Sequence, residues 1–179
     1  MSERLHSFGC DVVAVDQDPA VYKGGFPFIT LDFNQPAFAV QLGVAQFGLV
    51  IAVEVIEHVE SPICFLRNVG QLLAPGGVAV ITTPNVDSLP ARLKFLLAGK
   101  IRTMDENSDP THISPIFLDL LHRQFLPRAG LKLSEHLVFP PDGYQLTRKT
   151  IAWTLRLAAA AFSRPTLVGD HHIFVFEKT

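Results

Sequence analysis

Two long apolar runs, at residues 48–54 (GLVIAVE) and 78–82 (VAVIT), constrain the fold more than any other feature. They are continuous and rich in β-branched residues, as strands buried on both faces require. Between them, residues 61–62 (SP) mark a helix start, with serine as the N-cap and proline in the first turn. Residues 75–77 (PGG) then force a turn before the second run. Strand, helix and strand in this order predict a parallel βαβ unit.

The rest of the chain continues the alternation of strands and helices. We expect further strands at 11–16, 28–32, 131–139 and 173–177, and further helices at 2–8, 114–130 and 146–162. Residues 98–113 carry Gly, Asn, Asp and Pro, which predicts either a mobile lid over a site or a plain surface connection. A length of 179 residues favours one domain, residues 1–179, with an α/β fold.

Composition and charge exclude several classes of protein. The chain is 48% hydrophobic, enough for a sizeable core, and its 15 basic and 17 acidic residues leave a net charge of −2. A nucleic-acid partner is therefore not expected, because phosphate binding requires a basic face. Cys10 and Cys64 lack metal-ligand spacing, and residues 1–4 lack the features of a signal peptide, so a reducing cytoplasm is the simplest compartment.

No apolar run approaches the roughly 20 residues that span a bilayer, so no integral membrane segment is expected. The apolar helix predicted at 146–162 is read as core in preference to a membrane-surface or dimer contact. The pair His171 and His172, just before the last strand, is read as a surface feature, because a lone histidine pair rarely makes a metal site.

Acidic side chains follow the first two predicted strands. Asp16 ends the run at 11–16, where an acid in a nucleotide-binding α/β unit accepts hydrogen bonds from both ribose hydroxyls. Asp32 ends the run at 28–32. The alternative for each is a turn former, since Asp is common where a strand ends.

A cluster of acids and imidazoles follows the third strand. Glu54, Glu57 and His58 lie within five residues, and His112 lies in the irregular segment. An imidazole with an ordinary pKa near 6.5 suits a general base for a hydroxyl acceptor, so His58 and His112 are the predicted catalytic residues. Two carboxylates and two imidazoles are also a ligand set for a divalent cation. We weigh this alternative and favour no metal.

Residues 47–85 (FGLVIAVEVIEHVESPICFLRNVGQLLAPGGVAVITTPN) resemble the central block of class I S-adenosylmethionine (SAM)-dependent methyltransferases, most closely the ubiquinone-biosynthesis type. The run VVAVDQDP upstream and the segments THISPIFL and LPRAGL downstream resemble the family as well. The resemblance implies a Rossmann-like, mostly parallel sheet with an antiparallel C-terminal strand, and SAM as cofactor. It implies that the cofactor-binding residues are Asp16, Gln17, Asp32, Phe33, Val53 and Glu54. Among these, Asp16 would bind the ribose, Asp32 the adenine amino group, Phe33 the adenine face and Glu54 the methionine end.

One departure from the family is large. Members open with a strand and a G-x-G-x-G loop that receives the carboxypropyl end of SAM, and residues 1–8 resemble the helix after that loop. The first strand and the glycine loop are thus missing, and the domain is expected to be N-terminally incomplete. We favour a shortened reading of a longer gene over a natural remnant that has lost SAM binding.

The function expected from these features is methyl transfer from SAM to a small-molecule acceptor, most simply at oxygen. Because the glycine loop is absent, an inactive form of this truncated chain is part of the same expectation. The alternative is a non-catalytic methyltransferase-like domain that binds a partner, with a homodimer as one way of completing the sheet. An NAD-dependent Rossmann enzyme would also carry an acid after its second strand, but residues 54–59 (EVIEHV) and 83–85 (TPN) argue against it.

Overall fold

The computed structural model describes residues 1–147, 149–161 and 165–179. Its strands are β1 (Ala14–Asp16), β2 (Phe28–Thr30), β3 (Phe47–Val53), β4 (Leu73–Pro84), β5 (Leu131–Phe139) and β6 (His171–Lys178). Its α-helices are α1 (Ser2–Ser7), α2 (Phe38–Leu42), α3 (Pro62–Leu72), α4 (Leu89–Ala98), α5 (Leu118–Leu120), α6 (Leu126–Ala129) and α7 (Lys149–Ala161). Shorter turns are η1 (Pro19–Val21), η2 (Ile56–His58), the π-helical η3 (Leu121–Phe125) and η4 (Pro165–Leu167).

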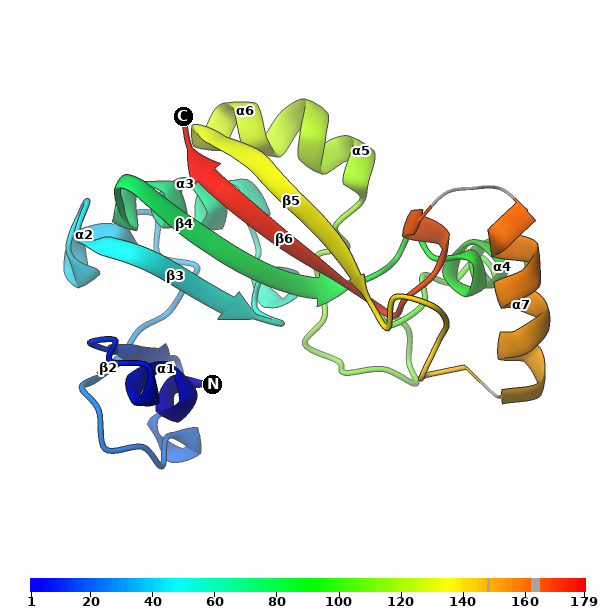
Figure 1. The fold of residues 1–179 in the computed structure, drawn as a ribbon, viewed down its shortest axis with the longest axis horizontal. Coiled ribbons are helices and arrows are strands. Elements are labelled where there is room, and N and C mark those ends of the chain that lie inside the picture. Colours follow the sequence, from blue (N-terminus) through cyan, green and yellow to red (C-terminus); the bar gives the residue numbers. More distant parts are fainter. Residues whose placement is uncertain (148, 162–164) are drawn as a thin grey trace.

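The strands form two separate sheets. β3, β4, β6 and β5 make a four-stranded sheet in that order, and within the described residues β1 and β2 pair only with each other. β3 pairs with β4 in parallel, whereas β6 lies between β4 and β5 and is antiparallel to both. The four-stranded sheet is therefore mixed, with three strands in one direction and the C-terminal strand reversed, as expected. Figure 1 shows the β1–β2 pair and α1 beside the open edge of β3.

The main core lies between one face of the larger sheet and the buried side chains of α3, η3 and α6 (Figure 1). The sheet contributes the fully buried side chains Ala79, Ile81, Phe174 and Phe176. Their spacing by two residues follows from strand geometry, which places alternate side chains on one face. The opposite face carries side chains that are only half-buried, such as Ile51, Val80 and Val175.

Helix α3 forms as the sequence predicts. The Ser61 hydroxyl accepts a hydrogen bond from the backbone N–H of Cys64 at 3.3 Å, and Pro62 occupies the first turn. Phe65, Leu66, Val69 and Leu72 then line one side of the helix and are buried against the sheet. The helix ends where Leu73 adopts extended backbone and begins β4. The turn predicted at residues 75–77 is not formed, because these residues lie inside β4, where the pairing with β3 shifts register.

Three local predictions differ from the structure, the first because of a tertiary contact. The helix expected from residue 114 begins at Leu118, because the Ser114 hydroxyl donates to the Val59 carbonyl at 2.6 Å instead of capping a helix. Helix α4 is absent from the sequence predictions, although proline occupies its first turn. The helix predicted at 146–162 is α7, and residues 148 and 162 lie outside the described residues. Across the described ranges, no helix is long and apolar enough to cross a membrane.

Candidate functional site

Glu54 stands where β3 ends, and three strands contribute to its surroundings. Its backbone is left-handed, with φ 52°, a conformation that is uncommon for a residue with a Cβ. Its Oε1 accepts a hydrogen bond from the Thr82 hydroxyl at 2.7 Å, and its Oε2 lies 3.1 Å from His171 Nδ1. Burial alone would raise the pKa of Glu54, but the hydrogen bonds from His171 and Thr82 hold it below its ordinary value. Glu54 is therefore a fixed carboxylate at the end of the sheet.

Glu57 is the buried acid of the cluster. It is 0% exposed, and neither carboxyl oxygen has a hydrogen-bond partner among the described residues. Burial, together with the neighbouring charge of Glu54, raises the pKa of Glu57 to about 8. Its backbone carbonyl accepts hydrogen bonds from Ile113 and Ser114, both at 2.9 Å. These two bonds bring the segment after α4 back onto η2.

His58 and His112 meet beside Glu57. Their rings are 4.6 Å apart between centroids and inclined by 70°. His58 Nδ1 lies 2.8 Å from the Thr111 hydroxyl, and His112 Nδ1 lies 2.7 Å from the Thr103 carbonyl oxygen. One ligand atom from each of Glu57, His58 and His112 lies within 4.8 Å of the others. The structure therefore brings together both residues predicted as bases, together with Glu57.

The loop that carries His112 is tied to the start of β6 by a buried ion pair. Arg102 Nη1 lies 2.8 Å from Asp170 Oδ1, and these side chains are 12% and 1% exposed. The other Asp170 oxygen accepts the backbone N–H groups of Gln145 and Leu146. Because Thr103 follows Arg102 directly, this ion pair also fixes the carbonyl that holds His112. Residues 99–113 thus form a loop that these contacts anchor beside the cluster, and its motion as a lid stays a prediction.

The other predicted cofactor residues lie at the ends of the first three strands. Asp16 ends β1, and Asp32 follows β2 at the same edge of the small sheet, since the two strands are parallel. Both carboxylates accept backbone N–H groups two residues further on, Asp16 at 3.0 Å and Asp32 at 2.9 Å, so both also form turns. Gln17 is exposed, and Val53 is 48% exposed at the end of β3. Their contacts with a cofactor stay predictions.

Phe33 has a packing role in this structure. Its half-buried ring makes edge contacts with Phe38 and Phe65, at centroid distances of 5.5 and 6.0 Å. These contacts join the small sheet to helices α2 and α3. Stacking of Phe33 on an adenine ring stays a prediction.

The two C-terminal histidines correct the sequence interpretation, which placed both on the surface. His171 is half-buried and holds Glu54, while His172 is 0% exposed. The signal available in the sequence was the alternation His172, Phe174, Phe176, which places the histidine on the same face of β6 as two core aromatics. Extending the predicted strand from residue 173 to residue 172 would have placed His172 on the buried face of the strand.

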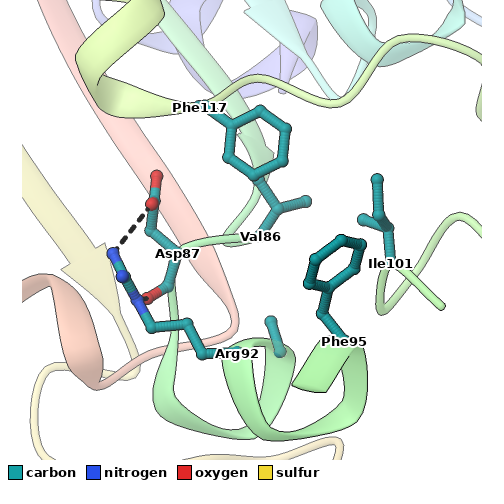
Figure 2. A pocket seen from close by; sticks show the side chains of 7 residues that line it. Val86, Asp87, Arg92, Phe95, Ile101 and Phe117 are labelled. Atoms are coloured by element: carbon teal, nitrogen blue, oxygen red, sulfur yellow. Dashed lines mark hydrogen bonds and ion pairs between the residues drawn. The ribbon is translucent and has the colours of Figure 1, made fainter. Parts of the chain in front are cut away.

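A cavity of about 250 Å³ lies beside the loop, and the sequence analysis missed it because α4 was not predicted. Figure 2 shows its apolar walls and the facing pair of Asp87 and Arg92, joined at 3.0 Å. The cavity is lined by Val86, Asp87, Ala91, Arg92, Phe95, Ile101 and Phe117. Ile101 directly precedes the arginine of the ion pair that ties down the loop, so the cavity adjoins the segment that carries His112.

Comparisons with known proteins agree with this geometry. The arrangement is shared with a SAM-dependent methyltransferase from Archaeoglobus fulgidus, at TM-score 0.64 and 16% identity over 98% of this chain and 80% of that one. A SAM-dependent methyltransferase from Mesorhizobium loti matches at TM-score 0.56 and 16% identity, over 97% and 83%. The fold is therefore that of class I SAM-dependent methyltransferases. A family model described as a methyltransferase domain matches residues 2–136, and the chain belongs to this family.

Curated relatives are ubiquinone biosynthesis O-methyltransferases. The protein from Cereibacter sphaeroides is 31% identical over 171 residues, covering 91% of this chain and 65% of its own length. The protein from Caulobacter sp. is 46% identical over 108 residues, covering 56% of this chain and 41% of its own length. The chain thus spans less than two thirds of the length of these relatives. The predicted resemblance to this family is confirmed.

Proposed function

We propose that this domain binds SAM and transfers its methyl group to the hydroxyl oxygen of a small-molecule acceptor. The observation that carries the proposal is the convergence of His58 and His112 next to Glu57, just beyond the end of β3. Two imidazoles at the carboxyl end of a parallel strand lie where ligands bind in open α/β sheets. The names of the curated relatives support oxygen as the acceptor atom.

The chemistry assigned to these residues is proton removal and positioning. As the acceptor oxygen attacks the methyl carbon of SAM, the bond from that carbon to sulfur breaks and its electron pair stays on sulfur. The acceptor proton passes to an imidazole nitrogen of His58 or His112. Displacement at a sulfonium needs little covalent assistance, so much of the rate enhancement would come from alignment of the two substrates.

Asp16 and Asp32 supply the proposed nucleoside contacts. Both carboxylates lie at the same edge of the small sheet, where they would accept from the ribose hydroxyls and the adenine amino group. Titration calorimetry with S-adenosylhomocysteine tests this step. We expect binding by the native chain and at least about tenfold weaker binding by Asp16→Ala, equivalent to about 1.4 kcal/mol. Absence of heat both from the native chain and from a chain extended upstream to include a glycine loop would refute cofactor binding and leave a non-catalytic binding domain as the alternative.

Acceptor chemistry is tested separately with SAM and a simple catechol probe. We expect His58→Ala and His112→Ala to lower the rate of methyl transfer by about a hundredfold or more, as loss of a general base does. The matched control is His6→Ala, which removes an exposed histidine of α1 outside the cluster. Transfer that is unaffected by both cluster variants would contradict the assignment of the bases.

A second candidate involves a divalent cation at the same cluster. The sequence interpretation favoured no metal, but the buried Glu57 carboxyl lacks a partner among the described residues and lies within reach of two imidazoles. One oxygen and two nitrogen donors fit a transition-metal ion such as Zn²⁺ or Mn²⁺. Glu57, His58 and His112 would hold it. When bound, such an ion would acidify the acceptor hydroxyl.

Cation binding is measured by titration calorimetry with Zn²⁺ and with Mn²⁺, independently of any activity. We expect Glu57→Gln to abolish binding, because the carboxyl can lose its proton to become a negative ligand when a cation binds, whereas the amide cannot. Glu60→Gln, which changes an exposed acid three residues later, should leave binding intact. Equal binding by the native chain and by Glu57→Gln would exclude this site.

A further inference from the structure

Two residues of the loop, Asp109 and Thr111, form a hydrogen-bonded chain that ends on His58. Asp109 Oδ1 accepts the backbone N–H of Thr111 at 2.9 Å and its hydroxyl at 2.5 Å. The same hydroxyl oxygen lies 2.8 Å from His58 Nδ1. The order of contacts is therefore carboxylate, hydroxyl, imidazole.

The hydrogens available on Asp109, Thr111 and His58 determine which group donates in each of these hydrogen bonds. The hydroxyl and backbone hydrogen bonds from Thr111 hold the pKa of Asp109 below its ordinary value, so its carboxylate can only accept at neutral pH. The single hydroxyl hydrogen of Thr111 is then used on Asp109. The Thr111 oxygen can only accept from His58, which requires the proton of the imidazole to be on Nδ1.

We propose that Asp109 and Thr111 are positioning residues that hold His58 in its Nδ1-protonated tautomer and leave the lone pair on Nε2 for the acceptor. Free histidine prefers the opposite tautomer, with the proton on Nε2, so the protein must impose this state. The inference rests on the proposed role of His58 as a base. It extends that role by naming the atom that acts and the residues that prepare it.

His112 is also held in its Nδ1-protonated tautomer, in this case by a backbone carbonyl. Its Nδ1 lies 2.7 Å from the Thr103 carbonyl oxygen, which has no hydrogen to donate. Nδ1 of His112 must therefore carry the proton as well, and its Nε2 carries the lone pair. Both rings of the cluster thus have Nε2 as the basic atom, although one is fixed by a side chain and the other by backbone.

The arrangement also has a consequence during the reaction. When Nε2 of His58 takes the acceptor proton, the ring becomes an imidazolium with a hydrogen on each nitrogen. Its Nδ1–H still donates to Thr111, and the negative charge of Asp109 lies one hydroxyl away from the new positive charge. The carboxylate therefore stabilises the protonated base without contacting it, by the logic of an oriented histidine in a catalytic triad.

The test is ¹⁵N NMR of the histidine side chains, which distinguishes protonated from unprotonated ring nitrogens without any substrate. In the native protein above pH 7.5 we expect the His58 signals to show Nδ1–H. Thr111→Val keeps the size of the side chain but loses the hydroxyl, so Nε2–H should predominate. Thr111→Ser should restore the native pattern, which a purely structural role of the methyl group would not do. A native spectrum with unprotonated Nδ1 would overturn the proposal.

Two substitutions of Asp109 distinguish the effect of its negative charge from the effect of its hydrogen-bond-accepting oxygen. Asp109→Asn keeps an accepting oxygen, so His58 should stay Nδ1-protonated. Asp109→Ala frees the Thr111 hydroxyl to donate to His58, so the tautomer should reverse. If the tautomer of His58 does not reverse in Asp109→Ala, the assignment of His58 as the donor to the Thr111 hydroxyl is wrong.

Methyl transfer to the catechol probe provides the functional readout. We expect Thr111→Val to lower kcat by about tenfold or more with KM unchanged, and Thr111→Ser to recover it to within about threefold. If the spectra behave as expected but no transfer occurs in the native chain, the proposed reaction fails while the tautomer assignment stands. Unchanged kcat in Thr111→Val, with transfer intact in the native chain, would refute the positioning role.

Discussion

His172 gives the fold a measurable sensitivity to acid. Its ring is fully buried on β6, where Nδ1 lies 3.0 Å from His136 Nε2 and Nε2 has no partner among the described residues. Burial, reinforced by the nearby charges of His136 and His171, lowers the pKa of His172 to about 3. In the unfolded chain its pKa would return to about 6.5. Protonation of His172 is therefore less favourable in the folded state than in the unfolded state.

The pH window follows from these two values. Above pH 6.5 the histidine is neutral in both states and contributes no pH dependence. As the pH falls through 6.5 the unfolded state binds a proton first, so the free energy of unfolding decreases until the pH approaches 3. At pH 4.5, two units below the unfolded pKa, the loss is about 2.7 kcal/mol at 1.36 kcal/mol per unit.

The assay is urea unfolding followed by circular dichroism at pH 7.5 and 4.5, for the native chain and His172→Leu. Leucine has a similar volume and no titrating group, so the native chain should lose about 2.5 kcal/mol more than the variant between these values. His6→Leu, at an exposed histidine, should follow the native chain. A difference below about 1 kcal/mol between the native chain and His172→Leu would refute the argument from burial.

Two further predictions concern backbone and helix packing, and both are measured as urea midpoints. Gly169→Ala should lower the free energy of unfolding by more than about 3 kcal/mol, because φ is +80° and a Cβ would meet the Val138 Cβ at 2.9 Å. Gly99→Ala, where φ is +66° and the space around a Cβ is open, should lower it by only about 1 kcal/mol. Equal losses of stability in the two variants would show that the contact with Val138 contributes nothing. Asn68→Ala should cost about 3 kcal/mol, because its buried amide bonds Ala39 N–H and two carbonyls at 2.9–3.0 Å; a loss under 1 kcal/mol would mean that water replaces it.

Local signals predicted the helices and strands where tertiary contacts agreed with them. The strand at 131–139 matches β5 in full, and the serine–proline start at residue 61 begins α3. The same serine–proline signal failed at residue 114, because that segment bonds to the backbone of η2. Two identical dipeptides thus differ in outcome through partners more than 50 residues away, which no local pattern contains.

The site was predictable to a similar extent. The sequence named His58, His112 and Glu57, and the structure brings them together. It gave no sign of Thr111 or of Arg102, because a single hydroxyl or guanidinium in a polar loop looks like any surface residue. Their roles depend on how that loop folds back onto η2 and the start of β6.

In the part of the chain that the structure describes, β1 and β2 pair with each other alone, which divides this part into regions of unequal local stability. Their ladder joins only three residues in each strand, whereas β4 and β6 pair along seven positions inside the larger sheet. Amide hydrogens of the short ladder can exchange with solvent through a local opening, while those of β4 and β6 need a far larger unfolding event. Any ligand that bridges Asp16 and Asp32 would therefore slow exchange in the small sheet first. Its measured affinity would include the free energy of holding that ladder closed.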